Sequence, residues 1–403
     1  MMAEDYRSLF EGHRESQPGV ACATLSHARE NSVLELESLG LPNNRLEYWK
    51  YSRIGKVLKG LEVNVNANDD ALNVDLGHLK DEQFEISSLR EAILANHPAI
   101  EQYLTKLAGT KNTGLTALNT AFFSNGIFIH IPDNTIVEEP IRLPNQTWNV
   151  DGGIIHPRNL IVVGKNSSVS IISQTNTASA LINTVEEIHI SENAELKHYV
   201  LQDTDISQVT SSFVVQKRDS RYTKVTTTLN GTFIRNNVNI HLEGTGCEAN
   251  LYGYYHINNK NQVDNHTIVE HKEPDCVSNE LYVGLLDDNA SGIFNGRVWV
   301  HQDAQRTNAF QSNKNILLSD NATMNTKPEL EIYADDVKCS HGATIGQVDQ
   351  EALFYLRSRG IPENIAMSML LQGFSVEVTD KIADAKFKHE VVEMILQKLG
   401  QHQ

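Results

Sequence analysis

The middle of the chain, from about residue 113 to 347, consists largely of short runs in which apolar and polar residues alternate. Clusters of Asn, Asp, Gly and Ser separate these runs, examples of which are IFIHI, NLIVV, SVSII and EEIHI. A period of two is typical of β-strands with one buried face, and the polar clusters are typical of turns. The sequence therefore predicts a mainly β region built from many short strands.

A weak repeat runs through this region, in which a turn residue and then a small residue precede the next alternating run. The first four small residues are 27, 26 and 27 positions apart, at Ser167, Ala194, Ser220 and Cys247. Later members are spaced irregularly, at Ala290, Ala304 and Ala322. A near-constant period of this size favours a stacked solenoid, and a right-handed parallel β-helix fits best. Three Asn-Gly pairs keep an antiparallel sandwich open as an alternative.

Residues 1–112 and 348–403 show the spacing of amphipathic helices instead. In the N-terminal part, one periodic run stops at Gly40, just before Pro42. We therefore expect three parts, namely a helical N-terminal region, a parallel β-helix core over residues 113–347 and a helical C-terminal region.

Three helices are expected in the C-terminal region. The first ends at Gly360, where glycine takes the left-handed cap after two arginines in the last turn. Pro362 opens the second helix, which is expected to stop at Gly373. The third runs from about Asp380 to Leu399, and its apolar face contains Phe387, Val391, Ile395 and Leu399.

Composition narrows the function classes. The chain has 34 Lys and Arg against 51 Asp and Glu, a formal charge of −17, which disfavours nonspecific nucleic-acid binding and docking on an anionic membrane. The four cysteines are too scattered for a disulfide scaffold, and there is neither a secretory signal nor an apolar run long enough to span a membrane. A cytoplasmic protein with reduced thiols is expected.

Motifs for enzymatic chemistry are missing. Gly164 and Lys165 follow a strand-like run, but Asn159 and Asn166 replace the residues that a P-loop needs. There is no HExxH motif and no nucleophile elbow, so the chain is not expected to be an enzyme. A carbohydrate-active β-helix enzyme could use acidic pairs such as Asp287–Asp288, but the secretion signal expected with it is absent.

Residues that could bind a soft metal ion occur at the end of the β region. In a strand, Cys339 and His341 point to the same side, so a thiolate and an imidazole could converge on iron, zinc or copper(I). A closed site needs about four ligands, so other loops or a second chain would have to supply the rest. On spacing alone, a buried thiol and a hydrogen-bonded histidine remain the favoured interpretation.

A second group, His266, His271 and Cys276, is a secondary metal-ligand candidate. Its spacing does not match a zinc finger, because no CxxC precedes it. Spacing alone favours polar residues at a coil edge or a protein interface. Cys247 occupies the small-residue position of the repeat and is interpreted as a packing residue.

Three stretches carry a resemblance to a known family. Residues 296–374, including the run DVKCSHGAT, closely resemble the SufB/SufD family of iron–sulfur cluster assembly proteins. Residues 40–54 (GLPNNRLEYWKYSRI) and 266–276 are also similar to that family. The chain is more similar to SufD than to SufB, because SufB chains typically carry His-Glu where this chain has KCSHGAT.

This resemblance implies a scaffold subunit with a right-handed parallel β-helix and no ATPase of its own. It implies that the ATPase SufC docks on the C-terminal helices and that the chain pairs with SufB, or forms a homodimer when SufB is absent. A transient Fe–S cluster would then form at the SufB–SufD interface, with His341 as a ligand and Cys339 as its neighbour. ATP would act only through SufC. The resemblance associates a reduced flavin with the complex, although this chain has no flavin motif.

Two other function classes stay open beside the scaffold. One is a plain structural or interaction protein without metal chemistry. The other is the β-helix carbohydrate-active enzyme. The effect of removing His341 on cluster formation distinguishes the scaffold from the plain interaction protein.

Overall fold

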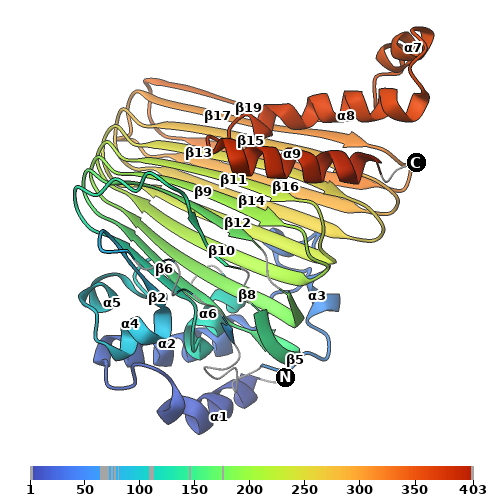
Figure 1. Ribbon diagram of the computed structural model, residues 1–403. Coiled ribbons are helices and arrows are strands. Elements are labelled where there is room, and N and C mark those ends of the chain that lie inside the picture. Colours follow the sequence, from blue (N-terminus) through green and yellow to red (C-terminus); the bar gives the residue numbers. More distant parts are fainter. Residues whose placement is uncertain are drawn as a thin grey trace.

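The core of the protein is a stack of coils whose strands alternate between two sheets (Figure 1). A computed structural model describes residues 3–63, 72–73, 76, 79, 81–108, 113–144, 147–174 and 177–400. In each sheet, hydrogen-bonded neighbours are mostly every second strand of the chain, and apart from the pairs β1–β5 and β2–β3 they run parallel. Each coil thus gives one strand to each sheet. This confirms the predicted parallel β-helix and excludes the antiparallel sandwich.

The first sheet, called sheet A here, has eleven strands. Its members are β1 (Leu72–Asn73), β2 (Glu85–Ser88), β3 (Ile127–Ile131), β5 (Thr147–Ile155), β6 (Arg158–Val163), β8 (Thr177–Ile190), β10 (Ser207–Gln216), β12 (Phe233–Leu242), β14 (Gln262–His271), β16 (Ser291–Val300) and β18 (Thr323–Ile332). Sheet B contains β4 (Ile141–Arg142), β7 (Ser168–Gln174), β9 (Glu195–Gln202), β11 (Arg221–Thr228), β13 (Glu248–Ile257), β15 (Val277–Leu286), β17 (Thr307–Leu317) and β19 (Val337–Gly346).

The inner faces of the sheets form the core, because in-register side chains of successive coils stack on one another. One column of sheet A is β-branched throughout: Ile161, Ile188, Val214, Ile240, Val269 and Val298. Each of these side chains is at most 3% exposed. A coil cannot bury its apolar face alone, so stability comes from this coil-on-coil contact.

The sequence repeat corresponds to the turn that leads into each sheet B strand. The residue before the small residue has a positive φ, for example 55° at Asn193 and 58° at Asp219. Asn and Asp tolerate this left-handed conformation better than other non-glycine residues. The backbone N–H of Asn193 donates to the carbonyl of Arg218 in the next coil over 2.9 Å. The repeat is therefore a structural one.

The irregular later steps of the repeat come from a change of turn. Strand register shows that the fifth small residue is Cys276, 29 positions after Cys247, and that Thr307 follows 31 positions later. Ala290 and Ala322 instead lie in the other set of turns, those that lead from sheet B into the sheet A strands β16 and β18. The period lengthens along the chain, so a fixed spacing of 27 misses these members. Cys247 is 1% exposed and lies in the core, as expected.

The N-terminal helices lie at the start of the solenoid, at the bottom of Figure 1. They are α1 (Ala3–His13), η1 (Arg14–Ser16), α2 (Ala23–Leu39), η2 (Glu47–Trp49), α3 (Ile54–Val57), α4 (Leu89–Leu94), α5 (Pro98–Tyr103) and α6 (Gly114–Phe122). Helix α2 ends before Gly40, whose φ is 64°, as predicted. Helix α6 lies within the region predicted to be β. All its residues are buried, but Thr116, Asn119 and Thr120 have helical spacing, a signal that the prediction of a β region overlooked.

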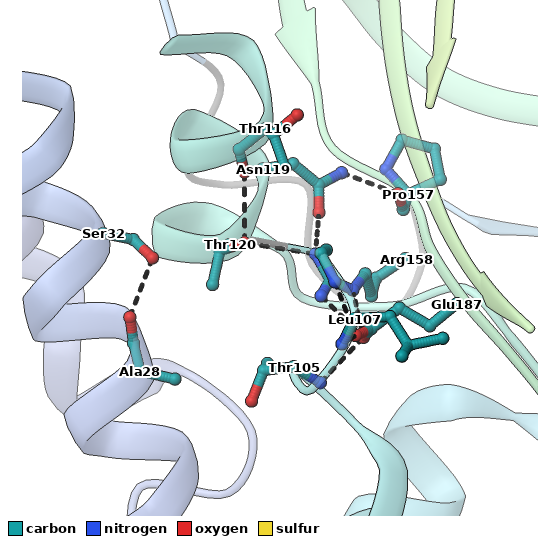
Figure 2. Close-up of polar contacts among 11 residues, drawn as sticks. Ala28, Ser32, Thr105, Leu107, Thr116, Asn119, Thr120, Pro157, Arg158 and Glu187 are labelled. Atoms are coloured by element: carbon teal, nitrogen blue, oxygen red, sulfur yellow. Dashed lines mark hydrogen bonds and ion pairs between the residues drawn. The ribbon is translucent and has the colours of Figure 1, made fainter. Parts of the chain in front are cut away.

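A buried ion pair joins this helical region to the first coils (Figure 2). Arg158 Nη2 lies 2.6 Å from Glu187 Oε2, and neither side chain is exposed. Glu187 also accepts backbone N–H groups from the segment after α5, at Thr105, Leu107 and Ala108. Arg158 Nη1 donates to Thr120 of α6 over 3.1 Å. One carboxylate and one guanidinium thus fix two segments of the helical region on the solenoid.

The C-terminal region forms α7 (Gln350–Ser358), α8 (Glu363–Thr379) and α9 (Ala385–Gly400). Gly360 has a φ of 83° and ends the first helix, as predicted. The predicted stop at Gly373 is wrong, because α8 continues to Thr379. Its last turns carry Phe374 and Val378 into the core against sheet B, and this packing outweighs the low helix propensity of glycine.

Helix α9 places its apolar face on the outer face of sheet B. Phe387, Val391, Ile395 and Leu399 are each at most 3% exposed, and the Phe387 ring stacks on Tyr199 with centroids 5.8 Å apart. The helix begins at Ala385 rather than near Asp380. Among the residues that the structure describes, no helix has the length and apolar character needed to cross a membrane.

Candidate functional site

The last coil of the solenoid is open to solvent. Strands β18 and β19 are the outermost strands of their sheets, and within the described part of the chain no further strand pairs with them. Most residues of β19 are exposed, whereas β15 in the same sheet is almost wholly buried. The far end of the stack, near the top of Figure 1, therefore presents two free strand edges and an uncovered interior.

Cys339 and His341 both lie on β19 and face the interior of this open coil. Cys339 is in register with Ala309, and it packs against the small apolar cluster of Val298, Val300, Ala304, Ala309 and Ala334. Burial raises the pKa of the Cys339 thiol. His341 is in register with Gln311 and is exposed. The structure thus places the two predicted donors on one face, one half-buried and one open to solvent.

Beneath His341 lies a polar column that sequence reasoning missed. Gln311 is 3% exposed, and its Nε2 donates to Glu280 Oε1 over 3.1 Å. Glu280 is also buried, and its other oxygen accepts a 2.5 Å hydrogen bond from the Thr267 hydroxyl of sheet A. Burial raises the pKa of the Glu280 carboxyl to about 7. The sequence signal is that β17 has polar residues at three successive inward-facing positions, Gln311, Asn313 and Asn315, where a core strand usually has apolar ones.

His266, His271 and Cys276 point to three different places. His266 lies on the outer face of sheet A, with Nε2 2.8 Å from Asp264 Oδ1, and burial lowers its pKa. His271 faces the interior, with Nε2 2.9 Å from the Ser278 hydroxyl, and burial lowers its pKa to about 4. Cys276 lies in the turn beside Cys247 and donates to the carbonyl of Gly244. They do not form one ligand set.

One other cluster does bring three donor atoms together. In the described part of the chain, ligand atoms of Glu85, His97 and His130 lie within 4.8 Å of one another. However, His97 Nδ1 accepts the backbone N–H of Ala99 as the cap of α5. A neutral imidazole that accepts at Nδ1 carries its proton on Nε2, which then donates to Glu85 over 3.1 Å. His97 therefore has no free nitrogen for a metal while it caps the helix.

The C-terminal helices carry a second exposed feature, four large apolar side chains on α7 and α8 that are together called the helix patch here. Its side chains are Phe354 (72% exposed), Tyr355 (57%), Ile365 (49%) and Met369 (48%). Helix α7 projects away from the solenoid (Figure 1). Several large apolar side chains left exposed on neighbouring helices favour a protein interaction site.

A long parallel β-helix that is flanked by helical regions and has thiol and imidazole donors at its uncovered end defines the chain as a β-solenoid protein. Residues 146–374 match the family model described as "SUF system FeS cluster assembly, SufBD core domain", and residues 76–143 match the "SufBD protein N-terminal region". The chain belongs to the SufB/SufD family of iron–sulfur cluster assembly proteins, and it is SufD-like.

Relatives of known name agree with this assignment. The chain is 31% identical to an iron–sulfur cluster assembly SufBD family protein of Synechocystis over 405 aligned residues, which cover 90% of this chain and 89% of the relative. It is 32% identical to SufD of Escherichia coli over 270 residues, 65% of this chain and 64% of that protein. It is 26% identical to SufD of Bacillus subtilis over 438 residues, 98% of this chain and 97% of that protein.

Proposed function

We propose that this chain is the SufD-type scaffold subunit of a SUF assembly complex, and that a nascent Fe–S cluster forms at its open end against SufB. The observation that carries the proposal is the position of His341 and Cys339 on the inward face of the last strand, beyond which the described chain has no further coil. The cluster is the cargo of this scaffold. The chain itself catalyses no reaction in this proposal.

The donor set supports a shared site. An exposed imidazole and a half-buried thiol are two of the ligand types that iron accepts, and a closed site needs about four ligands. His341 is the stronger candidate because it is accessible, whereas the raised pKa of Cys339 disfavours the thiolate that would bind iron. The remaining ligands would come from SufB thiolates or carboxylates.

The edges of β18 and β19 suit the pairing that this requires. A free strand edge can accept a strand of another chain through backbone hydrogen bonds. Three large apolar side chains are exposed beside these edges: Ile332 (38%), Tyr333 (62%) and Ile345 (47%). The proposed partner is SufB, or a second copy of this chain when SufB is absent.

The helix patch of α7 and α8 is the proposed docking surface for SufC. ATP would then act on the assembly only through SufC, and any flavin would belong to the assembled complex rather than to this chain alone. A cytoplasmic location, predicted from the reduced thiols, is part of the same proposal.

The test is His341→Ala in a complex co-purified anaerobically with SufB and SufC. Loss of a direct ligand should weaken iron binding by more than the ~10–100-fold that outer-shell changes cost, so iron and sulfide per complex should fall sharply. The control is His27→Ala, on exposed α2 at the opposite end, where the ring contacts Asn31. Normal iron and sulfide in His341→Ala complexes would instead support an interaction protein without metal chemistry.

A further inference from the structure

The polar column beneath His341 crosses three coils in register. Glu280 of β15 pairs with Gln311 of β17, and Gln311 pairs with His341 of β19. Since in-register residues of parallel strands project from the same face at neighbouring positions, the three side chains form one inward-facing row. The row leads from the closed interior to the uncovered coil.

The amide of Gln311 is held from one side only. Its Nε2 donates to Glu280 Oε1, and Thr267 donates to the other carboxylate oxygen, so the nitrogen end is fixed. Gly296 of the facing sheet provides the space, because a Cβ there would collide with the Gln311 amide. The Gln311 Oε1 atom is buried and has no hydrogen-bond partner among the described residues.

A buried acceptor without a donor is costly, typically ~1–3 kcal/mol, so its presence calls for a physical reason. A histidine that binds a metal through one nitrogen carries a proton on the other, and that N–H almost always donates to an oxygen acceptor that fixes the ring. His341 is exposed on a terminal strand and needs such an acceptor. The neighbouring Gln311 offers one, because its Oε1 atom accepts no hydrogen bond from the described residues.

We propose that Gln311 is the positioning residue of His341, accepting the N–H of the nitrogen that does not bind iron, with Glu280 and Thr267 holding the amide in place. This inference rests on the proposed function, since it assigns a role to Gln311 only if His341 is a ligand. The competing explanation is that Gln311 simply fills the interior of the last coils.

The first experiment observes the imidazole directly, without iron. In the full-length chain labelled with 15N-histidine, the His341 ring is expected to turn inward and donate to the unpaired Gln311 Oε1, so NMR should show it in one fixed tautomer. In Gln311→Met, which keeps the size but lacks an acceptor, the ring should lose this preference. Gln216→Met is the matched control, because Gln216 is also inward-facing, fully buried and left with an unpaired Oε1, but lies several coils away.

The second experiment measures iron in the complex with SufB and SufC. Gln311→Met should weaken iron binding about 10–100-fold, as outer-shell changes at metal sites do. Gln311→Asn keeps both an amide N–H donor and an acceptor oxygen and should retain more iron than Gln311→Met, which also covers the case in which the Met variant fails to fold. Gln216→Met should bind iron normally.

The outcomes separate this inference from the proposed function. The positioning role is overturned if Gln311→Met leaves both the His341 tautomer and the iron affinity unchanged. It is also overturned if Gln216→Met loses as much iron affinity as Gln311→Met, because that would show a general packing defect. If His341→Ala complexes retain their iron, the proposed function fails, and any tautomer effect of Gln311→Met then reports only a hydrogen bond.

Discussion

Arg158 and Glu187 face each other across 2.6 Å with both side chains fully buried, at the junction of the helical region and the solenoid. Although burial would raise the Glu187 pKa, Arg158 and the N–H groups of Leu107 and Ala108 hold it below its ordinary value. The carboxylate therefore stays charged. If it is removed, the Arg158 guanidinium loses its counter-ion and the backbone N–H groups lose their acceptor.

Glu187→Leu should destabilise the protein by about 3–5 kcal/mol, because it leaves the Arg158 guanidinium buried without a counter-ion. Urea unfolding followed by circular dichroism measures the change. Glu192→Leu is the control, since Glu192 pairs with Lys165 over 3.3 Å on the surface and should contribute within about 1 kcal/mol. Equal effects of the two substitutions would show that the buried pair does not anchor the helical region.

Glu280 should make stability fall as pH rises. Its pKa in the folded chain is about 7, above the ordinary 4.5, so between these values the folded state holds a proton that the unfolded state has released. The folded state is therefore progressively penalised from about pH 4.5 to 7, by at most about 3 kcal/mol. Glu280→Gln should be more stable than the wild type at pH 8, with a smaller difference at pH 5. A pH-independent difference in unfolding free energy would refute this.

The helix patch should be needed for SufC binding but not for folding. Phe354→Ser or Met369→Ser removes exposed apolar surface, so co-purification of SufC should drop while thermal stability stays unchanged. Leu94→Ser, at a 61% exposed position of α4, is the control at the other end of the molecule. Point changes are preferable to deletion of residues 348–403, since α8 and α9 cover sheet B and their loss would expose its apolar outer face. Undiminished SufC binding would place the docking surface elsewhere.

The open end should be the pairing surface with SufB. Ile345→Lys places a charge beside the free edge of β19 and should weaken the heterodimer, measured by light scattering after size-exclusion chromatography. Ile136→Lys changes a still more exposed isoleucine (65% against 47%) near the first coils and should have no effect. Crosslinks from residues 323–346 that reach SufC but never SufB would contradict the assignment.

The strands could be predicted from the sequence because local alternation reports which residues face inward. That is also why the shared face of Cys339 and His341 was predictable. The column of Glu280, Gln311 and His341 was not, since its members are 31 and 30 positions apart and their alignment depends on the turn lengths between them. Helix α6 was missed although Thr116, Asn119 and Thr120 have helical spacing, because the helix is only nine residues long and lies at the start of the β region.

The lengthening of the coils has a consequence for how this fold tolerates change. Four residues, 191–194, connect β8 to β9, whereas six, 301–306, connect β16 to β17. The strands between keep their register because each left-handed turn residue bonds to the next coil, as Arg306 N does to Asp336 O over 2.6 Å. Residues inserted into the connections from sheet A to sheet B therefore lengthen a coil without changing which strand residues face inward. The connections between the sheets can thus lengthen while the register that places Gln311 beside His341 is kept.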